Sequence, residues 1–273
     1  MASRGNVNKR FLYGYAGHAL AHLKVRRGER EDCPELPPDP DDYPTITCPL
    51  CLEDKAFGEF ESDHTPQLSG GSYFGESVVT VLTCAQCNRT ASLKYEKRAG
   101  DLAKRARDLG FESSPLMCQC HPSPTVERLE SGLLVHHDDT PRRLATMKSG
   151  FLLAFHILGY QWAASSALAP VREALLRGVL PPRRFGYVVG VNSDSDDLVV
   201  VDKRGPRPAV TVRGPGQYAV IFPGVGAKYA PEDPGGKARI YPWPYRPAGG
   251  KSINFLFAGG HLHHLDVCRR CEV

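Results

Sequence analysis

Apolar side chains recur at helical spacing through residues 147–178, and this pattern predicts two consecutive helices. Pro170 suits the first turn of the second helix, where its missing N–H would have no partner anyway. Gly178 suits the end of that helix. The first part is apolar over almost a membrane length, but His156 and Gln161 interrupt it. A buried core helix is therefore favoured over a transmembrane span.

The pattern changes to short β-branched runs in the last third of the chain. Residues 187–191 and 198–201 flank the polar sequence N-S-D-S-D-D, an arrangement that predicts a hairpin. Further strands are expected at residues 132–137, 210–212, 218–222 and 253–257. This region should therefore be rich in β-structure.

Polar segments alternate with helical patterns in the first 110 residues. Leucine and alanine recur at helical spacing in residues 16–23, which predicts a short helix. Residues 29–44 are acidic and rich in proline, and proline at this density blocks both helix and sheet pairing, so we expect a linker. Residues 87–109 are rich in helix formers, with a stop at Gly110 and a candidate interruption at Gly100.

Together these patterns predict an α+β protein in three parts. Residues 1–45 should form an N-terminal helix and a Pro/acidic linker, and residues 46–110 a central domain that carries the motifs discussed below. Residues 111–273 should form an α+β accessory domain, with a helical pair followed by a β-rich region. The sequence assigns no role to this last part.

Composition narrows the protein class only modestly. The chain has 273 residues, of which 41% are hydrophobic and 23% charged, as in ordinary globular proteins. The net charge of +4 is small, so any basic surface must be local. No apolar run of signal-peptide type follows the basic N-terminus, and no membrane span is predicted, so we expect a cytoplasmic protein.

Cysteine spacing points to a metal. Nine cysteines would be an odd number for a disulfide framework. Two C-x-x-C pairs, Cys48 with Cys51 and Cys84 with Cys87, suit a tetrahedral Zn²⁺ in a reducing compartment. A closed site of four thiolates leaves no position for substrate, so this zinc should be structural. For the cysteines alone, a simple zinc ribbon is the alternative.

The sequence between the cysteine pairs carries a further pattern. Residues 61–66 read E-S-D-H-T-P, residues 68–71 read L-S-G-G, and Asn88 follows the last cysteine directly. The combination C-x-x-C, D-H-x-P, S-G-G, L-x-C-x-x-C-N resembles the zinc-stabilised HNH endonuclease family, over roughly residues 46–100. This resemblance implies a β-hairpin and one helix, the ββα-metal finger, and metal-dependent hydrolysis of DNA phosphodiester bonds, as in restriction or phage defence.

The resemblance also implies roles for individual residues. His64 matches the general base, and an imidazole with a pKa of about 6.5 suits that task at neutral pH. Asp63 matches a ligand of a catalytic Mg²⁺ or Mn²⁺, and Asn88 matches the residue that holds the hairpin loop and His64 in position. Neighbouring side chains in a strand point to opposite faces, so Asp63 and His64 would need a strand end or a bulge to share one site.

The final motif position departs from the family. The family usually places His or Asn about two helical turns after the central asparagine, where this chain has Tyr95, Glu96 and Lys97. Glu96 lies about 80° round an ideal helix from Asn88. It is also the best of the three as a ligand for a hard cation. We therefore predict Glu96 as the second ligand of the catalytic ion.

The helix after Asn88 is the most cationic segment. DNA phosphate contacts, independent of base sequence, are predicted for Arg89, Lys94, Lys97 and Arg98. The alternative function is a non-catalytic zinc-binding module that contacts nucleic acid or a protein. The sequence leaves open whether a second zinc site forms from Cys118, Cys120, Cys268 and Cys271.

Overall fold

The computed structural model describes parts of the chain that include every element named below. The described residues are 4–29, 31–32, 39–65, 79–108, 116–118, 125–128, 134–137, 140–182, 187–190, 197–202, 209–213, 218–223 and 239–242. The expected strand at residues 253–257 and the side chains of the possible second zinc site lie outside this part of the protein.

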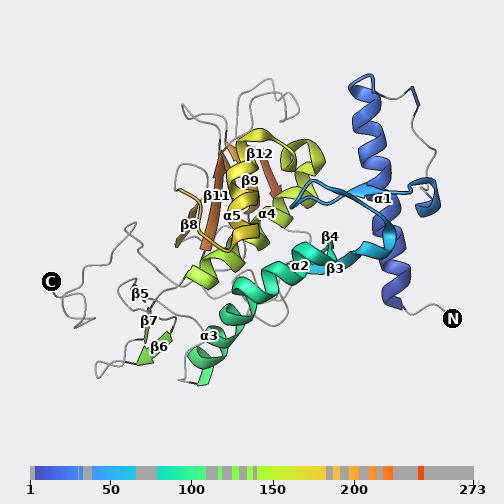
Figure 1. Ribbon diagram of the computed structural model, residues 1–273. Helices are drawn as coiled ribbons and strands as arrows, with labels where there is room; N and C mark the ends of the chain where they lie inside the picture. Colours follow the sequence, from blue (N-terminus) through green and yellow to red (C-terminus); the bar gives the residue numbers. More distant parts are fainter. Residues whose placement is uncertain are drawn as a thin grey trace.

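Helices and strands alternate along the chain, which confirms the predicted α+β class (Figure 1). The helices are α1 (Arg4–Arg26), α2 (Ala85–Ala91), α3 (Lys97–Asp108), α4 (Thr140–Ala163) and α5 (Ala169–Arg177). A π-helical turn, η3 (Ser92–Glu96), joins α2 to α3, and short 3₁₀ turns are η1 (Pro40–Asp42), η2 (Phe57–Glu59) and η4 (Ser166–Leu168).

The strands in the described part of the chain form four small sheets. Two antiparallel pairs are β1 (Ile46–Thr47) with β2 (Asp54–Lys55), and β3 (Phe60–Thr65) with β4 (Val79–Cys84). A three-stranded sheet has the order β5 (Leu116–Cys118), β7 (Leu134–His137), β6 (Thr125–Arg128). A five-stranded antiparallel sheet has the order β12 (Arg239–Pro242), β9 (Asp197–Asp202), β10 (Ala209–Arg213), β11 (Tyr218–Pro223), β8 (Tyr187–Gly190).

The hairpin predicted from residues 187–191 and 198–201 is wrong, although both strands exist. β8 pairs with β11 at the sheet edge, whereas β9 pairs with β10 and β12. The polar sequence between the two strands therefore did not identify the partner of either strand. The β10–β11 hairpin lies between the two strands and supplies both with their partners.

The central helices follow the sequence prediction closely. α5 carries Pro170 in its first turn and ends at Gly178, whose φ of 71° is the left-handed conformation that favours glycine. α4 is broken at Gly159, where φ is 73° and ψ is −171°. No helix among the described residues has the length and apolar character needed to cross a bilayer.

α4 packs against the five-stranded sheet and joins it to the rest of the core. The Phe151 ring lies 6.1 Å from that of Phe222 and 5.1 Å from that of Trp162. One residue earlier, a β-carbon at Gly150 would lie 2.8 Å from Cγ2 of Val220, so the helix backbone approaches the sheet closely there. The buried cluster extends from this contact to the cysteines and to Tyr13 of α1.

α1 is longer than the short helix expected and covers the cysteine-containing part of the chain. Tyr13 is fully buried, with its ring 5.3 Å from that of Phe57 and 5.8 Å from that of Phe60. Part of the predicted linker is also anchored here, because Arg10 forms an ion pair with Asp41 at 2.9 Å. Residues 33–38 of that linker lie outside the described part.

The helix predicted over residues 87–109 is present as α2, η3 and α3, and it continues through Gly100. The irregularity lies instead in the π-helical turn η3, which the sequence did not predict. Its last two residues, Tyr95 and Glu96, are both buried, as are Ala91, Ala99 and Leu102 on either side of it. This side of the helix therefore faces the core.

Candidate metal centre and buried ion cluster

Local backbone geometry positions the four cysteines in two pairs. Cys48 and Cys51 flank a tight turn in which Leu52 N–H donates to the Cys48 carbonyl at 2.9 Å and Cys48 N–H to the Glu53 carbonyl at 2.9 Å. Leu52 adopts a positive φ of 61° to close this turn. Cys84 ends β4 and caps α2, because its sulfur accepts from the Cys87 N–H at 3.4 Å.

The four sulfur atoms can hold a metal ion such as zinc. All four ligand atoms lie within 4.8 Å of one another, and Cys51 Sγ and Cys84 Sγ are 3.9 Å apart. A tetrahedral zinc with bonds of about 2.3 Å would separate its sulfur ligands by about 3.8 Å. The Cys84 N–H also donates to Cys48 Sγ at 3.4 Å, as expected around a thiolate.

The chemistry of the cluster also favours a bound cation. A hydrogen bond from Cys48 lowers the pKa of the Cys84 thiol to about 7. The pKa of Cys48 is raised, first through its contacts with Cys51 and the other cysteines and then through burial. Four crowded sulfurs cannot all ionise without a compensating positive charge, which a zinc ion would supply.

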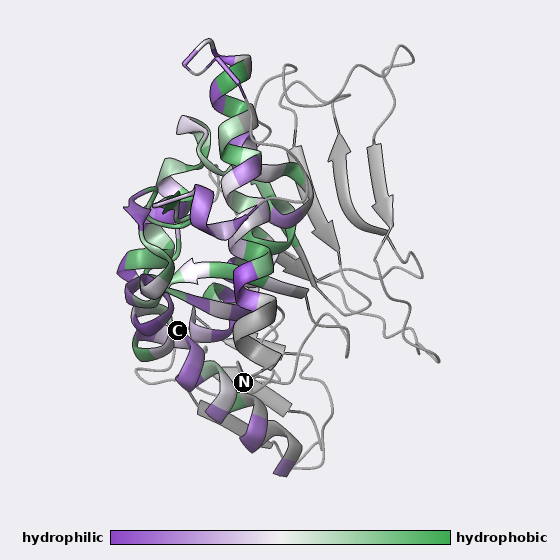
Figure 2. Ribbon diagram, turned by 90° about the vertical axis from the view of Figure 1, so that its right-hand side faces the viewer, coloured by the Kyte–Doolittle hydropathy of each residue, from purple (hydrophilic) through white to green (hydrophobic). Residues whose placement is uncertain are grey.

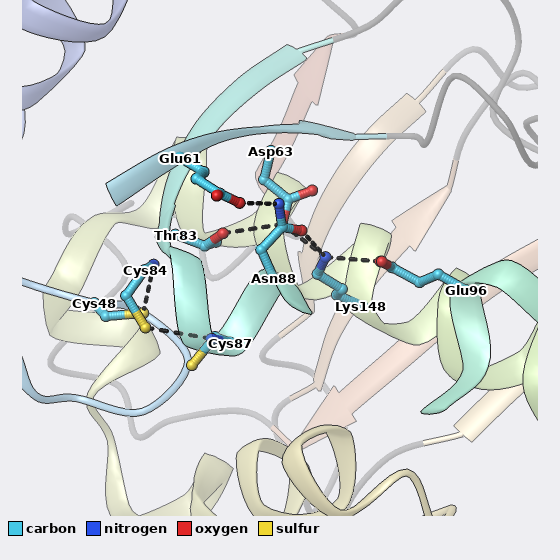
Figure 3. A network of polar contacts seen from close by, with 9 residues as sticks. All are labelled: Cys48, Glu61, Asp63, Thr83, Cys84, Cys87, Asn88, Glu96 and Lys148. Carbon is cyan, nitrogen blue, oxygen red and sulfur yellow. Dashed lines mark hydrogen bonds and ion pairs between the residues drawn. The ribbon is translucent and has the colours of Figure 1, made fainter. Parts of the chain in front are cut away.

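A second cluster lies beside the cysteines and centres on Lys148 (Figure 3). Its Nζ lies 2.6 Å from Oδ2 of Asp63 and 2.7 Å from Oε1 of Glu96. The Lys148 side chain is 2% exposed and the two carboxylate side chains are each 4% exposed. We call these three residues the buried ion triad. They come from β3, η3 and α4, so the triad joins the hairpin, the helix and the accessory region.

Polar neighbours complete the triad. The Thr83 hydroxyl donates to Oδ2 of Asp63 at 3.1 Å, from the neighbouring strand. Asn88 Nδ2 donates to Oε2 of Glu61 at 3.0 Å, while its Oδ1 accepts from Lys148 Nζ at 3.5 Å. Asn88 therefore links the triad to the more exposed carboxylate of Glu61.

Electrostatics keep Lys148 charged despite its burial. Desolvation alone would lower the pKa of this amine, because burial disfavours the ammonium form. The charges of Asp63 and Glu96 and their hydrogen bonds outweigh that effect, and the pKa of Lys148 is raised. Next to the triad, burial and then the Glu96 charge raise the pKa of Tyr95 well above its usual value. The triad therefore contains a permanent positive charge.

Of the residues predicted to form the catalytic site, Asp63, Glu96 and Asn88 lie around one position, whereas His64 lies apart. The cation at that position is the Lys148 ammonium group. His64 is exposed, and its Nδ1 lies 3.4 Å from the Thr80 hydroxyl. β3 and β4 pair in unbroken register from Phe60 to Thr65, with no bulge to turn His64 towards the buried side.

A hard divalent cation does not fit beside Lys148. The carboxylates of Asp63 and Glu96 are suitable ligands for Mg²⁺ or Mn²⁺. However, the oxygens that would bind the ion already contact the Lys148 ammonium at ion-pair distance. A second cation sharing them would be repelled by it, and all three side chains are almost inaccessible to solvent. The four cysteines can therefore hold a metal ion, whereas Asp63 and Glu96 hold the Lys148 ammonium group in place of one.

The sequence patterns did not indicate Lys148, Glu61 or Thr83 as members of this cluster. One signal could have indicated Lys148, since it is a single cation within the apolar pattern L-A-T-M-K-S-G-F-L-L. A lysine on the buried face of a helix requires a carboxylate partner, because an unpaired buried charge is very costly. Asp63 and Glu96, already singled out as ligands for a cation, were available partners.

The side chains predicted to contact phosphate lie on the solvent-exposed side of the helix. Arg89, Lys94, Lys97 and Arg98 are all exposed. Lys94 also donates to the carbonyl of Arg177 at 3.1 Å, at the end of α5, where a cation is favoured by the helix dipole. Figure 2 shows hydrophilic residues along α3, the lowest helix in both views.

Comparisons with known proteins assign no family. No family model matches the chain, and no similar protein was found among curated proteins or among solved structures. The functional argument therefore rests on the chain's own residues.

Proposed function

We propose that this protein binds DNA through the exposed side of α2, η3 and α3, held in place by a zinc ion on the four cysteines. The observation that carries the proposal is the concentration of positive charge on this one helical face. The described side chains that are charged and exposed there are Arg89, Lys94, Lys97, Arg98, Lys104, Arg105, Asp101 and Asp108. Six positive charges against two negative ones leave an excess of +4.

The positive excess on this helical face equals the net charge of the whole protein. The entire protein has a formal net charge of +4, so its other charged side chains cancel. A regular helix also spaces its basic side chains along a line, which suits a row of phosphates. Binding of this kind reads the backbone and not the bases, so we expect affinity with little sequence preference and a strong dependence on salt.

Burial of the opposite face fixes the direction of the basic one. Tyr95, Glu96 and Leu102 point into the core, and Glu96 is tied to Lys148. The cysteine cluster anchors the start of the same helix through Cys84 and Cys87. The helix is therefore presented as a rigid element, which lowers the entropic cost of binding.

A matched pair of triple variants tests the proposal. R98Q/K104Q/R105Q removes three charges from the proposed surface, and R10Q/K24Q/R27Q removes three exposed charges in and just after α1, outside that surface. Affinity of the zinc-loaded full chain for a labelled duplex is measured by fluorescence anisotropy over a salt series. The first variant should bind at least about tenfold more weakly, with a salt slope reduced by about 3. Equal losses in both variants would contradict the proposal.

DNA cleavage of the HNH type is the second candidate. The observation that favours it is the antiparallel pair β3–β4 followed directly by α2, which carries His64 at an exposed position beside a cysteine cluster that can hold zinc. Plasmid nicking with Mg²⁺ or Mn²⁺, compared with His64→Ala, tests this candidate. Cleavage that disappears in His64→Ala supports it, and cleavage unchanged in that variant refutes His64 as the base. Binding without any cleavage leaves the first proposal alone.

A further inference from the structure

We infer that Lys148 is the resident cation of Asp63 and Glu96, and that its ammonium group closes the position where the HNH resemblance implies a divalent metal. The wild-type pair should therefore not take up Mg²⁺ or Mn²⁺, and loss of the Lys148 charge should open the position to such an ion. The inference concerns ion occupancy and does not depend on DNA binding.

Three oxygen atoms surround the ammonium group of Lys148. Its Nζ lies 2.6 Å and 2.7 Å from two carboxylate oxygens and 3.5 Å from the Asn88 amide oxygen. An ammonium group has three donors, and these three oxygens can accept all of them. The group is therefore bound by oxygens as a small cation would be.

Lys148 is held in a buried position by the packing of α4. Lys148 is 1% exposed, and its neighbour Met147 is also 1% exposed. α4 is fixed against the sheet by the close approach of Gly150 to Val220 and by the Phe151 ring contacts. The ammonium is buried from solvent, and its departure would leave two buried carboxylates without the positive charge that balances them. The closed arrangement is thus the stable one.

The net charge of the triad depends on Lys148. Asp63 and Glu96 contribute two negative charges, and Lys148 neutralises one of them. Replacing Lys148 with an uncharged side chain restores a pair of negative charges in a dry site. Paired buried carboxylates of this kind either take up a proton or bind a divalent cation. One residue of α4 therefore determines which ion the pair accepts.

Mn²⁺ titration followed by electron paramagnetic resonance of the free ion tests the inference. The proteins are the zinc-loaded full-length wild type, E96Q, K148M and K148M/E96Q, so the cysteine site is already filled. Methionine matches the length of the lysine stem without its charge. We expect K148M to bind Mn²⁺ at least tenfold more tightly than wild type, and K148M/E96Q to lose that gain.

Two results would overturn the inference. One is Mn²⁺ binding by the wild type that E96Q abolishes, because the pair would then accept a metal beside Lys148. The other is a folded K148M protein with no gain in Mn²⁺ affinity. Circular dichroism establishes folding, and K148Q replaces K148M if the latter does not fold. If neither folds, the wild-type comparison with E96Q still decides, since equal weak binding by both supports a closed position.

Discussion

Asn88 holds Glu61 across the boundary between helix and hairpin, with 3.0 Å between the amide nitrogen and the carboxylate oxygen. The two residues are 27 positions apart in sequence. The family resemblance implied that this asparagine positions His64, whereas its contacts in the structure are with Glu61 and Lys148. Asn88 therefore connects the outer carboxylate to the buried ion triad.

Replacing Asn88 should weaken this connection in a graded way. Asn88→Ala removes a hydrogen bond to a charged group and should lower the free energy of unfolding by about 1–2 kcal/mol. Asn88→Asp should cost more, because it places a third carboxylate beside Glu61 and Asp63. Urea unfolding of the zinc-loaded proteins measures both. An Asn88→Asp protein as stable as wild type would show that this contact has no energetic role.

Removal of the Lys148 charge should be strongly destabilising in the absence of divalent ions. Lys148→Met leaves Asp63 and Glu96 buried without their partner, and breaking such a buried pair costs about 3–5 kcal/mol. Adding Asp63→Asn and Glu96→Gln should recover part of the loss, because amides carry no charge. Chemical unfolding of the zinc-loaded proteins in buffer prepared without Mg²⁺ or Mn²⁺ gives the three values. A loss below about 1 kcal/mol for the single variant would contradict the geometry.

Zinc removal should unfold the cysteine-containing part of the protein. We expect about one zinc per four clustered cysteines by elemental analysis, and a lower melting temperature after chelation. Re-addition of zinc should restore the wild type but not Cys84→Ser, which loses a ligand at the junction of β4 and α2. An unchanged melting temperature after complete zinc removal would exclude a structural role for the metal.

The contact of α4 with the sheet can be tested at one glycine. A β-carbon at Gly150 would lie 2.8 Å and 2.9 Å from side-chain atoms of Val220, so Gly150→Ala should destabilise by about 1–3 kcal/mol. Val220→Ala in the same chain should relieve part of this cost. Gly58→Ala is the matched control, because a β-carbon there meets nothing within 4 Å. Differential scanning calorimetry compares the three, and equal effects at both glycines would contradict the close packing.

Local patterns predicted the elements better than their partners. The two central helices and the stop at Gly178 follow from periodicity and from Pro and Gly positions, whereas the antiparallel pair β3–β4 was expected from the family resemblance. The partner of β8 did not, because β-branched runs of similar length are interchangeable until packing selects among them. A periodicity of 3.6 residues per turn also could not predict the π-helical turn, which contains more residues per turn.

The sequence likewise indicated some residues of the candidate site and not others. Cysteine spacing indicated the thiolate cluster, and the angle between Asn88 and Glu96 indicated that Glu96 turns inward. The identity of the cation could not be read from this region, since Lys148 lies 52 residues beyond Glu96 and reaches it only through the packing of α4. His64 shows the limit of motif reasoning, because strand alternation places it on the exposed side.

The π-helical turn at Ser92–Glu96 determines how α3 is rotated about the helix axis relative to α2. Such a turn holds one residue more than an α-helical turn. Deleting that residue would rotate everything after it by about 100°. Lys97, Arg98 and the rest of α3 would then turn out of alignment with Arg89, while the core residues Ala99 and Leu102 would turn towards water. The extra residue in this turn therefore keeps the core residues of α3 buried while its basic residues stay aligned with Arg89.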